Sequence, residues 1–285
     1  MRKTLTLLIP TIKVHSSLRM VFPKLRTKNK EFVVGTKEQH ILPHIDMNNR
    51  VFIRWGSPYK TSDISTSLDY NSRLSVVRAN DKKNSRLILA KAGIPVPRII
   101  TSNSKNIKYP LVARPRFHAF GRNFILLKHP KEFTSHYTNH APQGWYYSQF
   151  VDKVQEFRVH VAHGKVLCVL EKQGNKNEII WNRAQTRHSA VVVEPDQWKI
   201  LVIQAAVKAV KAIGIDFAGV DVMVDQDGKP YVLELNARPL MYSAPLISDK
   251  YAQYFDWLAS MDTKRVHFDL MSNKPSDYAF MASES

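Results

Sequence analysis

The chain has 285 residues, of which 44% are hydrophobic, and it carries a formal net charge of +18 at pH 7. This composition supports a globular protein with either two or three small domains or one large one. The absence of any run of about 18 apolar residues excludes a membrane-spanning helix and a membrane partner. The single cysteine, Cys168, excludes an internal disulfide framework, so we expect a buried thiol in a reducing, cytoplasmic compartment.

The positive charge favours anionic partners without choosing among them. Residues 1–30 contain basic side chains but no Asp or Glu. Nucleotides, acidic peptides and nucleic acid are all compatible with this charge. The chain has neither zinc-ligand spacing nor an aromatic and glycine-rich RNA motif, so nucleic acid rests on charge alone.

Short strand-like segments recur along the chain, beginning with TLTLLI at residues 4–9. Runs of apolar and aromatic residues predict further strands at residues 51–55, 110–115, 123–127, 145–151, 156–162, 165–172, 220–225 and 231–236. HGK at residues 163–165 and DQDGKP at residues 225–230 have the composition of hairpin turns. We therefore expect antiparallel neighbours across these two turns.

Helical periodicity is present in three segments. Residues 82–93, KKNSRLILAKAG, are followed by extended backbone after their last glycine. Residues 194–214 carry apolar side chains at intervals of three and four and end at Gly214. A third stripe within residues 248–260, which we expect to be core, consists of Tyr251, Tyr254, Phe255 and Leu258.

The sequence GIPVP at residues 93–97 marks a boundary, because its two prolines fix an extended backbone and prevent the helix from continuing. We expect a small α/β domain over residues 1–80 and, beyond it, mixed and antiparallel sheet with helices on its faces. The predicted class is α/β in the broad sense, with α+β character after the boundary. Residues 266–285 are expected to form a tail that frays.

The segment VLELNARP, residues 232–239, carries polar side chains on a strand. Because successive side chains point to opposite faces, Glu234, Asn236 and Arg238 share one face. Asp221 lies on the preceding strand of the same hairpin, so it can lie close to Glu234. Carboxylate and amide oxygens are the ligands that Mg²⁺ prefers, which predicts a metal site. A cation such as Arg238 could instead neutralise these acids without a metal.

With this hairpin, GVDVMVDQDGKPYVLELNARP, the chain resembles the ATP-grasp superfamily. Three further segments occur in the order that the family shows: the helix and GIPVP turn at residues 81–100, the lid strands and phosphate loop at residues 109–127, and the adenine-side segment at residues 145–172. The resemblance covers residues 80–242. Within the superfamily the chain is most similar to ligases of the ribosomal-protein glutamate ligase type.

The resemblance implies an ATP-grasp fold, in which two mixed or antiparallel α+β subdomains sandwich the nucleotide. The grasp domain would cover residues 81–265. Its lid subdomain would span residues 98–150, and its C-terminal metal-binding subdomain residues 151–265.

The resemblance also implies three groups of site residues. The ligands of Mg²⁺, or of Mn²⁺, would be Asp221, Glu234 and Asn236. The residues that contact ATP would be Lys82, Arg114, Gly121, Glu156 and the hinge residues Gln149, Phe150 and Val151. The residues that act on the reacting groups would be Arg158, Arg183, Arg187 and Arg238.

Several of these roles have plain structural alternatives. Lys82 could be a solvated lysine of a first helical turn, and Arg158 could form a strand salt bridge. Arg114 stands where the family usually has lysine, and it keeps the charge but is bulkier. Gly121 is the one glycine of a lid loop that often has more. Glu156 would accept hydrogen bonds from the ribose hydroxyls.

Together these parts imply a Mg-ATP-dependent ligase that joins a carboxylate to an amine through an acyl phosphate. Neither substrate follows from the chain, although the basic charge would suit an acidic peptide or protein acceptor. Two alternatives use the same scaffold. One is a kinase that phosphorylates a hydroxyl, and the other is an ATP-binding protein without catalysis, which Arg114 and the glycine-poor lid would favour.

Overall fold

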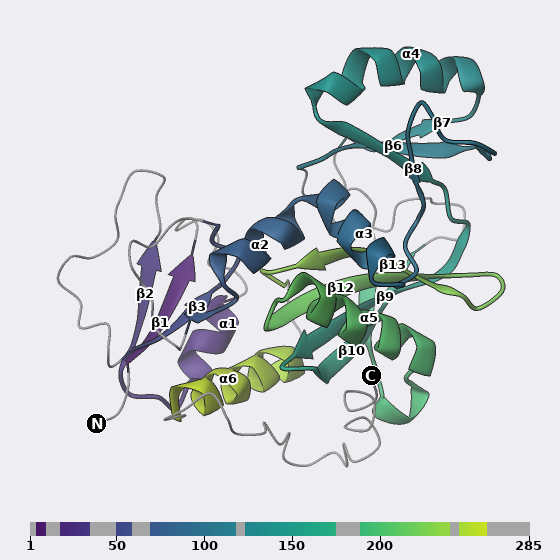
Figure 1. Ribbon diagram of the computed structural model, residues 1–285. Helices are drawn as coiled ribbons and strands as arrows, with labels where there is room; N and C mark the ends of the chain where they lie inside the picture. The colour runs from purple at the N-terminus through teal and green to yellow at the C-terminus, as the bar shows by residue number, and fades with distance from the viewer. Residues whose placement is uncertain are drawn as a thin grey trace.

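The computed structural model describes residues 4–9, 18–34, 50–58, 69–117, 123–174, 189–239 and 245–260. In this part of the chain helices flank three β-sheets, which confirms the expected α/β class with a large antiparallel part (Figure 1). No helix among these residues is both long and apolar enough to cross a bilayer. The expected tail at residues 266–285 lies outside the described residues.

The N-terminal sheet is parallel. Its strands are β1 (Thr4–Ile9), β2 (Lys30–Val34), β3 (Arg50–Arg54) and β4 (Asp69–Tyr70), in the spatial order β2-β1-β3-β4. The helix α1 (Leu18–Val21) and the 3₁₀ turn η2 (Phe22–Lys24) lie between β1 and β2, since parallel neighbours need a crossover connection. The strands expected at residues 4–9 and 51–55 are confirmed, the second beginning one residue earlier.

Two helices connect this sheet to the rest of the chain, α2 (Arg73–Asn80) and α3 (Lys82–Lys91). Asp81 lies between them and accepts a hydrogen bond from the Asn84 N–H at 3.1 Å, which caps α3. Gly93, at φ +73°, follows the end of α3 as predicted. The sequence pattern does not indicate α2, in which only three of eight residues are buried.

The lid sheet is antiparallel and stands apart from the other sheets at the top of Figure 1. Its strands are β5 (Ile99–Ile100), β6 (Leu111–Pro115), β7 (Ile125–Leu127) and β8 (Trp145–Gln149), in the spatial order β5-β8-β6-β7. Helix α4 (Pro130–His140) and the turn η4 (Ala141–Gln143), which the sequence does not indicate, precede β8. The predicted strands of this region are confirmed with shorter ends.

The large sheet is antiparallel as well. Its strands are β9 (Lys153–Ala162), β10 (Lys165–Gln173), β11 (Ser189–Val193), β12 (Phe217–Asp225) and β13 (Pro230–Asn236), in the spatial order β11-β10-β9-β12-β13. The hairpins expected at residues 163–165 and 225–230 are confirmed, because β9 pairs with β10 and β12 pairs with β13.

Helix α5 (Ile200–Ile213) covers one face of the large sheet. Its buried side chains share a core with strand residues such as Val159 and Val220. The helix begins six residues later than the predicted start at residue 194. Residues 195–197 form the 3₁₀ turn η5, and the two residues after it have extended backbone.

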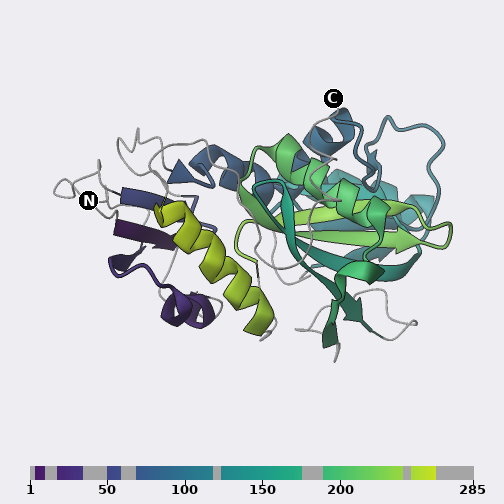
Figure 2. The same cartoon turned by 90° about the horizontal axis from the view of Figure 1, so that it is seen from below.

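Helix α6 (Pro245–Ser260) covers part of the opposite face, and Figure 2 shows it between the N-terminal sheet and the large sheet. The stripe predicted to be core is fully buried: Tyr251, Tyr254, Phe255 and Leu258. The Tyr251 ring lies 5.4 Å from that of Trp55, which directly follows β3 of the N-terminal sheet, and 6.1 Å from that of Phe217 in the large sheet. Cys168 belongs to the same core, and burial raises the pKa of its thiol to about 12.

Candidate active site

Charged side chains occupy the part of the large sheet that α6 leaves uncovered. In β9, Phe157 points into the core beneath α5, so its neighbours Glu156 and Arg158 point to the opposite face. Lys172 of β10 pairs with Glu156 in the register, and Asp221 of β12 pairs with Arg158. Two acids and two bases, all buried, therefore meet on three adjacent strands.

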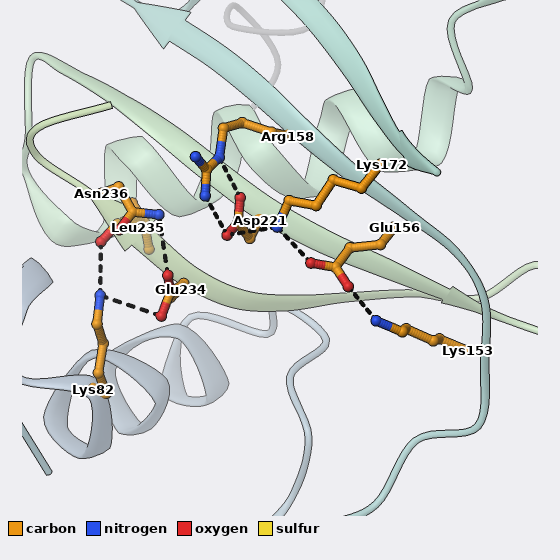
Figure 3. A network of polar contacts seen from close by, with 9 residues as sticks. All are labelled: Lys82, Lys153, Glu156, Arg158, Lys172, Asp221, Glu234, Leu235 and Asn236. Atoms are coloured by element: carbon orange, nitrogen blue, oxygen red, sulfur yellow. Dashed lines mark hydrogen bonds and ion pairs between the residues drawn. The ribbon is translucent and has the colours of Figure 1, made fainter. Parts of the chain in front are cut away.

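Asp221 is at the centre of this ionic network (Figure 3). The Arg158 guanidinium donates two hydrogen bonds to its carboxylate, each 2.7 Å long. The Lys172 ammonium donates to the same carboxylate at 3.0 Å and also to Glu156. Lys153 donates to the other oxygen of Glu156. The two acids are thus held by three cations.

Electrostatics keep both acids ionised. Burial alone would raise the pKa of Asp221, but the charges of Arg158 and Lys172 outweigh it and hold this pKa below its ordinary value. The two lysines beside Glu156 lower the pKa of that acid against burial in the same way. His160, next on the same face of β9, has its pKa lowered to about 3 by burial and by Arg158, so it is neutral.

A second cluster lies beside the network at the end of β13, directly across from Asp221. Lys82, the buried first residue of α3, lies 3.5 Å from the Glu234 carboxylate and donates to the Leu235 carbonyl at 3.2 Å. The Asn236 amide nitrogen donates to the other Glu234 oxygen at 3.2 Å. The amide oxygen of Asn236 is therefore the atom that it can offer to a ligand.

A β-bulge decides which way Glu234 points. Asp221 pairs with Glu234, whereas the next residue of β12 pairs with Val232, so Leu233 is an extra residue. Val232 and Leu235 lie in one core although they are three residues apart. Strict alternation from Val232 would have placed Glu234 in that core. The bulge turns Glu234 to the opposite face.

The types of Asp221, Glu234 and Asn236 fit a hard divalent cation, because two carboxylates and one amide oxygen lie on adjoining positions of one hairpin. Across the described part of the chain, no group of three or more His, Cys, Asp or Glu side chains could hold a metal. A metal at this hairpin would have the Asn236 oxygen as a third protein ligand beside the two carboxylates. Both Asp221 oxygens also accept hydrogen bonds from Arg158 or Lys172. A metal ion would have to displace these donors or share the oxygens with them.

Two arginines approach this site from the lid side. The Arg114 guanidinium of β6 lies 5.6 Å from the centre of the Phe124 ring, and its buried Nε has no hydrogen-bond partner among the described residues. Arg86 of α3 donates to the Ser148 hydroxyl of β8 at 2.9 Å. Burial lowers the pKa of Arg86, and the neighbouring charge of Arg114 lowers it further.

The connection between β8 and β9 contains the residues expected at the hinge, Gln149, Phe150 and Val151. The N–H groups of Gln149 and Phe150 donate to carbonyl groups of the lid, at 2.9 and 3.4 Å. Val151 follows outside any strand. Asp152, the next residue, is exposed and accepts a hydrogen bond from the Gln226 side chain at 3.2 Å.

The structure brings six of the fourteen expected site residues together: Lys82, Glu156, Arg158, Asp221, Glu234 and Asn236. The apolar part of the Arg238 side chain packs against Gly56, just after β3, where a Cβ added to this glycine would lie 2.8 Å from the arginine Cβ. Gly121, Arg183 and Arg187 lie outside the described residues.

Sequence reasoning missed three cations, Lys153, Lys172 and Arg86. The sequence does indicate Lys172, because the alternation of an apolar strand places it on the buried face. A buried lysine needs acidic side chains opposite it. Arg86 lies three residues before Leu89 on the buried stripe of α3, where an arginine needs a partner. Lys153 is too far toward the strand end for alternation to place it.

The fold and the site define the class of protein. A lid sheet and a large antiparallel sheet, with cations and carboxylates where they meet, are the parts of an ATP-grasp protein. A family model described as RimK-like ATP-grasp domain matches residues 79–245, more than half of the chain. The chain belongs to this RimK-like ATP-grasp family.

Curated relatives match the same region. A probable alpha-L-glutamate ligase of Haemophilus influenzae is 28% identical over 181 residues, which cover 59% of this chain and 58% of the relative. A probable alpha-L-glutamate ligase of Psychromonas ingrahamii is 27% identical over 192 residues, which cover 62% and 61%. The match thus spans less than two thirds of each relative.

Solved structures show the same fold over most of the chain. D-alanine–D-alanine ligase of Bacillus anthracis superposes with a TM-score of 0.65 and 20% identity, covering 90% of this chain and 94% of that one. The ATP-grasp ligase PsnB, complexed with a minimal precursor, superposes with a TM-score of 0.66 and 17% identity, covering 90% and 100%. At such identities the likeness concerns the fold.

Proposed function

We propose that the protein is a Mg-ATP-dependent ligase that joins a carboxylate to an amine. The carboxylate oxygen takes the terminal phosphoryl group of ATP, and ADP leaves. The amine nitrogen then attacks the acyl carbon, phosphate leaves with the C–O bond electrons, and the nitrogen gives up a proton. The products are an amide, ADP and inorganic phosphate. Membership of the RimK-like family and the ligase names of the relatives support this reaction.

The observation that carries the proposal is the charge balance of the site. Its cations are Lys82, Arg86, Arg114, Lys153, Arg158 and Lys172, and its carboxylates are Glu156, Asp221 and Glu234. Among the residues that the structure describes at the site, six cations and three carboxylates leave an excess of three positive charges in a largely buried region. Such an excess is costly without anions, and a triphosphate supplies them.

The residues divide into phosphate contacts and metal ligands. Lys82 and Arg114, from α3 and the lid, would bind phosphate oxygens. Asp221, Glu234 and Asn236 would hold Mg²⁺, or Mn²⁺, which when bound neutralises phosphate charge and polarises the transferring group. Cations fixed in advance around developing negative charge lower the barrier mainly by electrostatic stabilisation.

The nucleoside would lie at the hinge, with the adenine along Gln149, Phe150 and Val151. For the ribose hydroxyls the geometry favours Asp152 over Glu156. Both Glu156 oxygens are engaged by lysines in a buried position, whereas the Asp152 carboxylate is exposed at the hinge. In this arrangement Glu156 orients the lysines.

Contacts with the reacting groups are proposed for four arginines: Arg158, Arg183, Arg187 and Arg238. Arg158 is fixed by Asp221 and can stabilise the acyl phosphate with its planar guanidinium. The names of the relatives support glutamate as the amine substrate. The net charge of +18 favours an acidic peptide or protein as the carboxylate partner.

The test is a screen for ADP release with Mg-ATP, single amino acids and acidic peptides, followed by mass spectrometry of the acceptor. We expect ADP and free phosphate in equal amounts and an acceptor heavier by one amino-acid residue. A phosphorylated acceptor without free phosphate would show a kinase instead. Tight ATP binding without turnover on any acceptor would show an inactive binding protein, the alternative that Arg114 favours.

A further inference from the structure

Arg86 is a buried arginine that the proposed reaction does not place against any substrate. It lies one turn after Lys82 on α3, and only 3% of its surface is exposed. A buried guanidinium loses its hydration, so its position is costly unless specific contacts offset that loss. The contacts that Arg86 makes therefore indicate what it does.

These contacts join three elements. The Arg86 Nε donates to the Leu233 carbonyl of β13 at 3.3 Å, and a terminal nitrogen donates to the Ser148 hydroxyl of β8 at 2.9 Å. The guanidinium also lies 5.2 Å from the centre of the Tyr146 ring in β8. One side chain of α3 thus holds a lid strand and a strand of the large sheet.

The contact with Leu233 has a particular consequence. Leu233 is the extra residue of the bulge that turns Glu234 away from the core. A bulge interrupts the regular ladder, so a polar group there needs a partner other than the neighbouring strand. The Arg86 Nε supplies that partner for the Leu233 carbonyl, one residue before Glu234.

The surroundings of Arg86 also favour an anion. Among the described residues its hydrogen bonds go to neutral oxygens, from a carbonyl and a hydroxyl. The nearby charge of Arg114 disfavours the charged form of the Arg86 guanidinium, and the charge of Glu234 favours that form. Negative charge bound between the lid and β13 would therefore stabilise Arg86 in this position.

We propose that Arg86 is a positioning residue that secures the bulge at Leu233, and with it the direction of Glu234, while tying β13 to the lid strand β8. Its effect on catalysis rests on the proposed ligase function, because Glu234 would act there as a metal ligand. Its effect on the bulge does not depend on that function.

The first experiment measures amide hydrogen exchange over residues 230–239 in Arg86→Met, Arg86→Lys and the wild type. Met keeps the apolar stem and removes the donors, so we expect exchange at least tenfold faster in this segment. Lys91→Met removes an exposed charge from the same helix and should leave the exchange unchanged. Unchanged protection in a folded Arg86→Met protein would overturn the proposal.

Because Arg86→Met removes contacts to two strands at once, Ser148→Ala provides a second, milder change. It removes the hydrogen bond from Arg86 to the lid and leaves the Leu233 contact in place. We expect faster exchange at residues 145–149 with protection of residues 230–239 retained. If Ser148→Ala loosens both segments equally, Arg86 does not hold the bulge independently of the lid, and the proposal is wrong.

The second experiment measures the ATP dissociation constant with and without Mg²⁺ by calorimetry. Arg86→Lys keeps the positive charge but loses the planar guanidinium with its several donors. We expect the increase in ATP affinity caused by Mg²⁺ to be about tenfold smaller in this variant. We also expect kcat to fall by a larger factor than KM for ATP rises. An unchanged Mg²⁺ effect would overturn the link to Glu234. If the wild type itself binds no nucleotide, the ligase proposal fails, while the exchange experiment still decides the role of Arg86.

Discussion

Asp221 and Glu234 lie directly opposite each other on β12 and β13, yet each carboxylate is held by different cations. Arg158 and Lys172 hold Asp221, whereas Lys82 lies beside Glu234. Two acids on one hairpin would repel each other if they were left alone. The separate sets of cations offset this repulsion, so the two carboxylates can lie side by side on one hairpin.

Replacing these two acids should therefore have different effects on stability. Asp221→Ala leaves Arg158 and Lys172 buried without their shared partner, and we expect a loss of about 3–5 kcal/mol in the free energy of unfolding. Glu234→Gln changes a side chain that is 24% exposed, and we expect a loss of about 1 kcal/mol or less. Denaturant unfolding measures both.

Turnover should not follow stability in these variants. As a proposed metal ligand, Glu234 is needed for the reaction, so Glu234→Gln should lower kcat by about 100-fold or more while the fold is kept. Asp227→Asn, in the exposed turn of the same hairpin, is the matched control and should be active. An active Glu234→Gln enzyme would remove Glu234 from the metal site.

Lys172 donates hydrogen bonds to both Glu156 and Asp221. Replacing Lys172 by Met tests how much each acid depends on this shared cation. The variant leaves two buried acids with fewer cations, so the pKa of Glu156 should rise and the free energy of unfolding at pH 7 should fall by about 3 kcal/mol or more. The loss should shrink as the pH falls through 4.5, the ordinary value for Glu, because the acid then becomes neutral.

The double variant Lys172→Met with Glu156→Gln tests this assignment. Removing the acid as well as the lysine should recover part of the stability at pH 7, because the buried carboxylate that lost its Lys172 partner is then absent. If the two losses are simply additive, Lys172 and Glu156 do not depend on each other.

Much of this fold could be predicted from the sequence, because periodicity depends on burial alone. The alternation in β9 and β12 and the stripes of α5 and α6 separate core from surface without knowledge of the partners. Short elements such as α2 and β4 could not be predicted, since few of their residues are buried. They are fixed by contacts with segments far along the chain.

The candidate site was partly predictable for a related reason. Asp221, Glu234 and Asn236 lie within one hairpin, so their proximity follows from local structure. Lys172 and Arg86 reach the site from other elements, and only the pairing of strands and the placement of α3 bring them there. The bulge at Leu233 was equally hidden, because an extra residue leaves no mark in the sequence.

Arg114 offers a test of a departure from the family pattern. Its guanidinium stacks near Phe124 and brings an unpartnered Nε into the lid side of the site. Arg114→Met should weaken ATP binding about 10- to 100-fold, the worth of a charged hydrogen bond. Arg114→Lys keeps the charge and should weaken it by less than tenfold. Turnover that appears only in Arg114→Lys would show that the wild type is an inactive binding protein.

His160 should make stability depend on pH between its two pKa values. In the folded protein burial and Arg158 lower its pKa to about 3 from an ordinary 6.5. The unfolded chain therefore binds one proton more in this window, so stability is complete above pH 6.5 and falls as the pH decreases, by about 1.4 kcal/mol per pH unit.

Unfolding of the wild type and His160→Gln at several pH values isolates this contribution. Between pH 6 and pH 4.5, the free energy of unfolding should change with pH more steeply in the wild type than in His160→Gln. The difference between the two slopes should correspond to one bound proton, about 1.4 kcal/mol per pH unit. Tyr251→Phe removes the hydroxyl that lies 3.1 Å from His160 Nδ1 but keeps the imidazole, so its slope should remain that of the wild type. Equal slopes in His160→Gln and the wild type would show that His160 is protonated when folded.

The roles of Asp152 and Glu156 can be distinguished by comparing nucleotides with and without the ribose hydroxyls. If the exposed Asp152 carboxylate accepts the ribose hydroxyls, Asp152→Asn should weaken ATP binding by about tenfold or more and should leave the binding of 2′,3′-dideoxy-ATP unchanged. Glu156→Gln should weaken both nucleotides alike, because its effect would pass through Lys153 and Lys172. Calorimetric titration of both nucleotides gives the comparison. If Glu156→Gln alone abolishes the preference for ATP, Glu156 is the ribose acceptor that the family resemblance implies, and its lysines must move to release it.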